Sequence, residues 1–261
     1  MKYKKGQILL ITVMLLATVM TVVLSISFKS VTETQVTKLE EESQKALAVA
    51  ESAIEAALKA NTSITLSSIS GLSGFDGTAT LTTSTDVKFT TPNIEANGSY
   101  TFYLGNYNVS SKTMSDLPAQ DYTICFENGS PDEPALEITL VKDSGVKKYV
   151  VDPNSPKKIS NAPVNTPACN PDSTNYSYSI HIPSADVGAD AKFLIIRVLY
   201  SPTRLFFTGG NNLLTPTILL PVQGRTITSQ ATSNTSLGVS KKVVLFQSYP
   251  QIPGEFFSTS F

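Results

Sequence analysis

The longest apolar run of the chain lies near its start, from Ile8 to Phe28. A helix over this run would span roughly 31 Å, close to the hydrocarbon core of a bilayer, which is about 30 Å thick. The run has no charged residue, glycine or proline, and it is apolar on every side of the helix, as membrane spans are. Its polar residues all bear hydroxyls, which can bond to the helix's own carbonyls in lipid. The pattern therefore predicts a transmembrane helix over residues 8–28.

The helical pattern continues beyond this run, because no glycine or proline occurs from Gln7 to Ser70. After Phe28, apolar and small side chains recur at steps of three and four residues, which places them on one face of a helix. The residues of this packing stripe are Val36, Leu39, Ser43, Ala46, Ala50, Ala53 and Ala57. The sequence thus predicts one helix over residues 7–60, about 80 Å long, that stops at Asn61. Its small side chains would let another surface pack closely.

After residue 61 the pattern changes to that of β-structure. All fifteen prolines lie at or after Pro92, and the glycines other than Gly6 lie at or after Gly71, so turns are frequent. Runs of β-branched and aromatic residues between these turns are typical of strands. The expected strands are Tyr100–Leu104, Tyr122–Phe126, Leu136–Val141, Lys147–Val151, Tyr176–Ile182, Phe193–Tyr200, Leu205–Thr208, Thr217–Leu220, Arg225–Ser229 and Lys242–Ser248. Residues 61–98 show only short alternating stretches, which indicate an irregular connection.

Phe193–Tyr200 is the most continuously apolar of these strands, so we expect it at the centre of a sheet. Asp143-Ser144-Gly145 is a hairpin turn signal, and the last two strands form a second hairpin before a proline-rich aromatic tail. The expected core residues are Leu66, Ile124, Ile138, Ile180, Ile195, Val198, Ile227 and Val244. The expected fold class is α+β, with a long N-terminal transmembrane and amphipathic helix followed by a β-rich extracytoplasmic head over residues 61–261.

Positive charge flanks the apolar run unequally. Lys2, Lys4 and Lys5 precede the run, whereas Lys29 stands alone after it. The positive-inside rule therefore predicts a single-pass protein of the inner (cytoplasmic) membrane, with a cytoplasmic N-terminus and with residues 29–261 outside. A cleaved secretory signal peptide fits poorly, because the run exceeds the usual apolar length of about 7–15 residues and no A-x-A-like site follows it. The net charge of −1 gives no indication of a nucleic-acid partner.

A short basic leader that ends at Gly6, an apolar run and an amphipathic helix together resemble the N-terminus of a class III (type IV) prepilin. With the Ala50-Glu51-Ser52-Ala53 segment near the helix end, the first sixty or so residues are similar to the N-terminal domain of PilX-type minor pilins. The C-terminal hairpin also resembles such proteins, less specifically. The resemblance implies a leader of residues 1–6, cleaved between Gly6 and Gln7 by a prepilin peptidase. It also implies that other pilins and the pilus assembly machinery are partners.

One position departs from the pilin pattern. If Gln7 is the first residue of the processed chain, the fifth is Ile11, where most pilins carry Glu. In the family, that Glu is thought to neutralise the N-terminal amine of a neighbouring subunit in the filament. Its absence resembles certain minor pilins and pseudopilins, and it argues against a role as the major subunit.

The sequence shows no motif of an enzyme: G-x-S-x-G, H-E-x-x-H and G-x-x-x-x-G-K-[ST] are all missing. His181 is the only histidine, and a catalytic triad or a zinc site needs further partners. The segments 152–154 and 170–173 offer oxygen ligands for calcium, but turn chemistry accounts for their Asp, Asn and Pro residues. We therefore expect no catalytic residue, no metal and no cofactor.

The two cysteines, Cys125 and Cys169, both lie in the expected head. Cys125 lies within a predicted strand, and Cys169 lies in a proline-rich loop over residues 153–171. Outside the cytoplasm disulfides persist, and closing a loop of this length contributes about 4 kcal/mol in the chain-entropy model. We expect a disulfide between them, with two free thiols as the alternative.

The leading hypothesis is a structural protein: a type IV pilus-like minor pilin whose helix anchors in the membrane and then packs in a surface filament, with its head exposed. Adhesion, motility, DNA uptake and secretion remain open as the role of that filament. The alternative is a single-pass membrane-anchored binding module or adhesin that is never assembled. An anchored enzyme is the least supported of the three.

Overall fold

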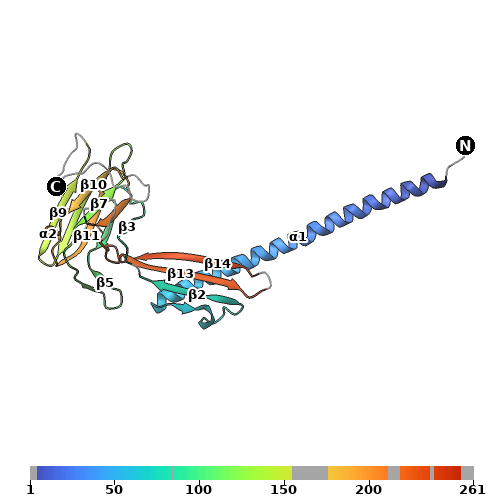
Figure 1. Cartoon of the computed structure of the whole chain (residues 1–261), viewed down its shortest axis with the longest axis horizontal. Coiled ribbons are helices and arrows are strands. Elements are labelled where there is room, and N and C mark those ends of the chain that lie inside the picture. Colours follow the sequence, from blue (N-terminus) through green and yellow to red (C-terminus); the bar gives the residue numbers. More distant parts are fainter. Residues whose placement is uncertain (1–4, 84, 155–175, 211–217, 236–237, 254–261) are drawn as a thin grey trace. The chain divides into compact units, whose positions relative to one another are not determined.

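The computed structural model describes residues 5–83, 85–154, 176–210, 218–235 and 238–253 (Figure 1). Its internal contacts divide the chain into two compact units. The first unit contains Met1–Leu81 and Ile227–Leu245, and the second contains Thr82–Thr226 and Phe246–Phe261. Most of the second unit is therefore inserted between the two segments of the first, and the last residues of the chain return to the second unit.

The first element is the helix α1, Lys5–Ala60, drawn in blue in Figure 1. Its outer half is rich in alanine, glutamate and lysine, which favour the helix intrinsically. The helix ends at Asn61, whose φ of 53° is the left-handed conformation that commonly terminates helices. The backbone N–H of Asn61 donates a hydrogen bond to the carbonyl of Leu58 at 3.3 Å. The helix thus ends where the sequence indicates.

A four-stranded sheet completes the first unit, in the order β1-β2-β13-β14. Its strands are β1 (Ile64–Thr65), β2 (Phe75–Thr82), β13 (Gly224–Ser233) and β14 (Ser240–Ser248), and the short 3-10 helix η1 (Leu66–Ser68) follows β1. Because side chains alternate along a strand, Ala79, Ile227 and Ala231 are buried in one cluster with residues of α1. Thr78 and Thr80 alternate with Ala79 and are exposed, so the opposite face of the sheet is polar along this part of β2.

The second unit is a sandwich of two four-stranded sheets. One sheet has the order β10-β7-β12-β3, with β3 (Lys88–Thr90), β7 (Tyr122–Phe126), β10 (Tyr178–Ile182) and β12 (Leu205–Gly209). The other has the order β4-β11-β8-β9, with β4 (Ser99–Tyr103), β8 (Ala135–Lys142), β9 (Gly145–Val151) and β11 (Ala191–Leu199). Neighbouring strands in both sheets are antiparallel. The short pair β5 (Asn106–Asn108) and β6 (Thr113–Ser115) and the helical turn α2 (Ser184–Val187) complete the unit.

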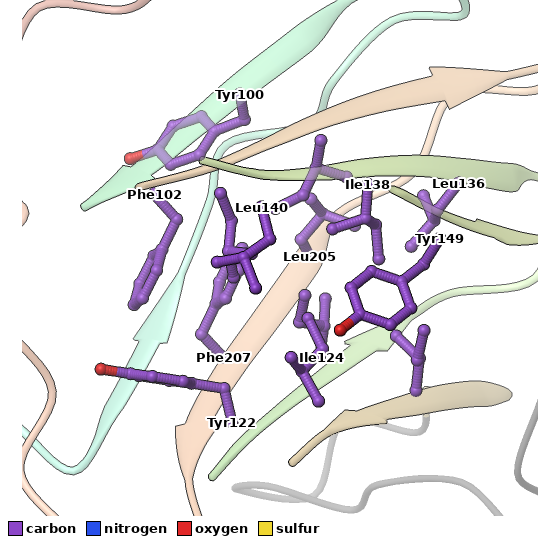
Figure 2. Packing of buried hydrophobic residues seen from close by; sticks show 14 of the residues in the cluster. Tyr100, Phe102, Tyr122, Ile124, Leu136, Ile138, Leu140, Tyr149, Leu205 and Phe207 are labelled. Atoms are coloured by element: carbon purple, nitrogen blue, oxygen red, sulfur yellow. The ribbon is translucent and has the colours of Figure 1, made fainter. Parts of the chain in front are cut away.

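Apolar side chains from both sheets of the sandwich form one core, part of which Figure 2 shows. The ring of Phe102 on β4 stacks on the ring of Phe207 on β12, with centroids 4.1 Å apart and planes at 4°. Tyr122 lies beside them, and burial raises the pKa of its phenol to about 12. Its hydroxyl accepts a hydrogen bond from Nε2 of Gln120 at 2.6 Å. The phenol is therefore buried without leaving its oxygen unbonded.

Several expectations from the sequence are confirmed. The continuously apolar run forms β11, which lies between β4 and β8 and pairs with both. The predicted turn joins β8 to β9, and Gly145 adopts a φ of 141° that disfavours other residues. Seven of the eight expected core residues are buried: Leu66, Ile124, Ile138, Ile180, Ile195, Val198 and Ile227. The fold is α+β, with one long helix followed by antiparallel sheets.

Two expectations are wrong. Val244, the eighth expected core residue, has 57% of its surface exposed. It lies on β14 at the edge of the sheet, and its neighbour Val243 is the residue that packs on the cluster with α1. The expected strand Thr217–Leu220 is also missing from the described residues 218–220: Ile218 makes only an isolated bridge to Gly209, and Leu219 is exposed. Pro221 follows this run at once, and its lack of an N–H weakens strand pairing there.

Candidate functional site

The first half of α1 exposes an apolar surface on all its sides. Between Leu9 and Phe28, the large apolar side chains are 47–71% exposed. Such surface is unfavourable in water by about 25 cal/mol per Å². Among the described residues, this helix is the one long and apolar enough to cross a membrane. Its length and composition therefore suit a bilayer or a bundle of other apolar helices.

Four hydroxyl groups of the apolar segment, those of Thr12, Thr18, Thr21 and Ser27, are bonded within the helix. Oγ1 of Thr12 donates to the carbonyl of Leu9 at 2.8 Å, and Oγ1 of Thr18 donates to the carbonyl of Leu15 at the same distance. Oγ of Ser27 donates to the carbonyl of Val23 at 2.9 Å. Since lipid offers no hydrogen-bond partner, these internal bonds remove the cost of placing the hydroxyls there.

The expected cleavage site lies at the start of α1, which begins at Lys5. Gly6 and Gln7 belong to its first turns, and Ile11 is 57% exposed. Lys2 and Lys4 of the leader lie outside the described residues. At the other end of the apolar run, the ammonium of Lys29 lies 3.8 Å from the carboxylate of Glu33 on the next turn. Cleavage between Gly6 and Gln7 remains a prediction.

The outer end of α1 packs on the sheet of the first unit, and we call this contact the helix seat. Its helix residues are alanines of the packing stripe, with none of their surface exposed: Ala46, Ala50, Ala53 and Ala57. The last three share a buried cluster with Leu66, Ala79, Ile227 and Ala231. Small side chains on both surfaces allow helix and sheet to approach closely. The stripe's three-and-four spacing therefore coincides with a real packing face over this stretch.

Sequence reasoning missed two helix residues of the seat. Val49 and Ile54 are 7% and 6% exposed and belong to the same cluster. Each lies next to a stripe residue and three or four residues from another, so widening the stripe to neighbouring helical positions would have found them. The buried face is thus broader than one line of alanines.

The part of the stripe nearer the apolar run is exposed. Val36 is 47% exposed and Leu39 is 41% exposed. Leu47, one turn from Ser43, is also 41% exposed. These apolar side chains lie beyond the apolar run, and no described residue covers them. The packing role of this stretch therefore remains a prediction.

Two features of the seat require particular small residues. A Cβ added to Gly77 would lie 1.9 Å from the carbonyl oxygen of Gln230, so glycine is needed where β2 meets β13. Oγ of Ser233 on β13 donates to Oε2 of Glu42 on α1 at 2.7 Å, which adds a polar contact to the apolar ones. Neither the Ser233–Glu42 contact nor the strand pairing at Gly77 has a local sequence signal.

Surface charge on the outer half of α1 is partly paired. The ammonium of Lys45 lies 2.7 Å from the carboxylate of Glu41, in the i,i+4 arrangement expected from the sequence. The hydrogen bond from Lys45 lowers the pKa of Glu41. Both groups are fully open to solvent, where such pairs contribute little to stability. The seat, rather than this pair, holds the helix against the sheet.

Cys125 lies on β7 with none of its surface exposed, in a small cluster with Tyr176 and Phe206. No cysteine among the described residues carries a free thiol. Cys169 lies outside the described residues, so its pairing with Cys125 remains a prediction.

The polar groups considered as candidate chemistry are engaged in local contacts. Nε2 of His181 lies 3.7 Å from Oδ2 of Asp121, whose Oδ1 accepts a hydrogen bond from the N–H of Ser184 at 2.6 Å. That bond lowers the pKa of Asp121. Oδ1 of Asp152 accepts from the N–H of Asn154 at 2.8 Å, as in an ordinary turn. Residues 170–173 lie outside the described part, and within it no three His, Cys, Asp or Glu residues gather as metal ligands.

A shallow cleft opens on the second unit beside Phe89 and Phe246. The two rings lie 6.1 Å apart between their centroids, and Phe246 is 47% exposed. Asp86 and Lys88 also line the cleft. The cleft thus combines an aromatic surface with one negative and one positive side chain. It suits a ligand in which an apolar side chain has polar groups beside it.

Replacing Ala53 by Glu should destabilise the first unit. The carboxylate would enter the fully buried helix seat without a partner, which costs about 3–5 kcal/mol for an uncompensated buried charge. The matched control is Ala48→Glu, at an exposed position of the same helix, which should change stability by less than about 0.5 kcal/mol. Denaturant unfolding of the full chain in detergent measures both. Equal stability of the two variants would show that α1 is not seated on the sheet.

Thiol labelling tests the expected disulfide. Unreduced, denatured full-length protein should react with less than one equivalent of a maleimide, because Cys125 and Cys169 are bonded to each other. After reduction, the same protein should take up two equivalents. Two reactive thiols in the unreduced sample would contradict the pairing.

Comparison of this chain with protein-family models, with curated proteins and with solved structures finds no match. The functional reading therefore rests on the residues and on the geometry described above.

Proposed function

We propose that this chain is a minor subunit of a type IV pilus-like filament. Its α1 anchors it in the cytoplasmic membrane before assembly and packs against the apolar helices of other subunits afterwards. Its β-rich part is exposed at the cell surface. Other pilins, a prepilin peptidase and the assembly machinery are the proposed partners.

The observation that carries this proposal is the continuity of α1. One helix without a break is apolar on all sides over its first half and seated on a sheet over its last turns. A plain membrane anchor needs no rigid link between the span and the folded part. A filament subunit does, because its apolar helix and its head must keep a fixed register to repeat along the filament. The unbroken helix therefore favours a filament subunit over a protein that is only tethered to the membrane.

The charges around the apolar run support the proposed orientation. Lys2, Lys4 and Lys5 precede the run, and the first charge after it is Lys29. The positive-inside rule then retains the N-terminus in the cytoplasm and exports the sheets. An oxidising exterior would also permit the expected disulfide.

The isoleucine at position 11 supports the role of a minor rather than a major pilin subunit. After cleavage, the new amine at Gln7 would lack a carboxylate at the fifth position, where Ile11 stands. Burying an unpaired ammonium among apolar helices is costly. A filament made only of this subunit would repeat that cost at every contact, whereas a subunit at the tip or among Glu-bearing pilins would not.

A membrane-anchored binding module is the second candidate. The inserted second unit, with its own core and its cleft at Phe89 and Phe246, favours it. This candidate needs no processing, so the N-terminus of the protein extracted from membranes separates the two. A start at Met1 supports the module, and a start at Gln7 with a methylated amine supports the pilin.

The substitution Gly6→Glu should block processing, because prepilin peptidases require the small residue before the scissile bond. The variant should keep residues 1–6, remain in the membrane and be lost from the cell surface. Intact mass and surface labelling measure both outcomes. Lys4→Arg is the matched control, since it keeps the leader's charge and should be processed normally. Wild-type processing of Gly6→Glu would contradict the proposed cleavage.

The composition of purified filaments tests whether this chain is a minor or a major subunit. We expect this chain at low abundance, and we expect it to form no filaments when it is the only pilin expressed. Replacing Ile11 by Glu should supply the missing carboxylate and raise its share of the filament. Quantitative mass spectrometry of sheared filaments gives that share. A filament in which the unmodified chain is the dominant protein would contradict the inference from Ile11.

A further inference from the structure

The edge strand β14 has an unpartnered outer side. In the sheet order β1-β2-β13-β14, it pairs with β13 on one side and with no other described strand on the other. Along its part in the first unit, Lys241 and Lys242 are followed by Val243, Val244 and Leu245. Val244 is 57% exposed and Leu245 is 38% exposed. An exposed apolar edge of this kind is a template for pairing with another strand.

A second copy of this chain fits the edge poorly in antiparallel pairing. Two β14 strands joined in this way are related by a twofold axis perpendicular to the sheet. That axis would also reverse the direction of α1, which runs alongside the strands of this sheet in the first unit (Figure 1). The two apolar helices would then point in opposite directions. Under the proposed membrane orientation, on which this step rests, both could not occupy one membrane with cytoplasmic N-termini.

Symmetric parallel pairing of two copies fails for a different reason. A twofold axis along the strands keeps both helices in one direction, but it places each backbone C=O of the edge opposite the same C=O, and each N–H opposite the same N–H, of the other copy. Donors then do not meet acceptors, so the two edges cannot form a hydrogen-bonded ladder. The other edge of this sheet, β1, has only two residues and offers little backbone for head-to-tail pairing.

We propose that the outer edge of β14 binds an extended strand of a different protein, with acidic side chains opposite Lys241 and Lys242 and apolar ones opposite Val244 and Leu245. The backbone groups of the edge supply the hydrogen bonds, and the apolar pair supplies buried area. The two lysines attract a strand that bears carboxylates. This surface deepens the proposed function, because a neighbouring filament subunit is the kind of chain that would present such a strand.

The test uses a synthetic strand as the probe. A fluorescent peptide about ten residues long alternates Val and Thr and ends in two Glu, so that antiparallel pairing places the carboxylates beside Lys241 and Lys242. A control peptide carries Lys in place of both Glu. Fluorescence anisotropy with the full chain in non-ionic detergent should show at least about tenfold tighter binding of the acidic peptide. Added salt should reduce this difference.

Two variants locate the binding. Val244→Lys places a charge within the apolar run and should weaken binding of the acidic peptide by at least about tenfold. Thr80→Lys, at an exposed position on the same sheet but on an inner strand, should leave it unchanged. Both variants should unfold at the wild-type denaturant concentration, which excludes misfolding as the cause of lost binding.

Three results would overturn the proposal: equal affinity for both peptides, no effect of Val244→Lys, or a wild-type dimer in detergent that Val244→Lys dissociates. The last would identify a second copy as the occupant. None of these measurements depends on cleavage at Gly6. A failed docking test therefore leaves the processing result standing, and a failed processing test leaves the docking result standing.

Discussion

The first unit depends on the close contact between α1 and its sheet. Residues Ala50, Ala53 and Ala57 of the helix share one buried cluster with Ala79, Ile227 and Ala231 of the sheet, so small side chains lie on both sides of the contact. Such contacts gain dispersion energy only if the surfaces fit without gaps. The stripe is therefore made of the smallest apolar residue, at the cost of the larger hydrophobic gain that leucine would bring. Close fit, rather than large buried area, fixes the helix on this sheet.

The two halves of α1 present different surfaces. Its first half exposes apolar side chains on all sides, and its hydroxyls bond inward to carbonyls such as those of Leu9 and Val23. Its outer half meets water on one side, where Glu41 and Lys45 pair, and the sheet on the other. The change from an apolar to an amphipathic surface takes place without any break in the backbone, so side-chain chemistry alone marks it. Lys29 is the first charged residue after the apolar run.

The elements that sequence could predict are those with local causes. The three-and-four spacing of the alanines and the αL-prone Asn61 lie within one helix, and both indications agree with the structure. The apolar run of β11 and the turn before Gly145 are equally local. The failed prediction for Val244 depended on a partner far away in the chain, whereas the failed strand Thr217–Leu220 is followed at once by Pro221. Val244 was expected inside because period-two alternation gives two equivalent faces, and only the position of α1 decides which one is buried.

Other features had no local signal at all. The Ser233–Glu42 hydrogen bond joins residues that are distant in sequence, and the need for glycine at 77 arises from the backbone of β13. The division into two units could not be predicted from the sequence either, because it depends on the return of β13 and β14 to the first sheet. The leader lysines and the expected cleavage position, in contrast, are local features of the sequence, and the described residues begin at Lys5, after Lys2 and Lys4.

The place of the insertion has a consequence for how such a protein can change. β2 ends at Thr82 and β13 begins at Gly224, and these two strands are neighbours in the sheet. Oγ1 of Thr82 donates to the carbonyl of Thr226 at 3.3 Å, so the outgoing and returning chains run side by side. The segment between them can therefore change in length while β2 and β13 keep their pairing. The tail after Leu245 bonds to Thr101 and Tyr103 of the second unit and must change with it. The two units can thus change at different rates within one polypeptide.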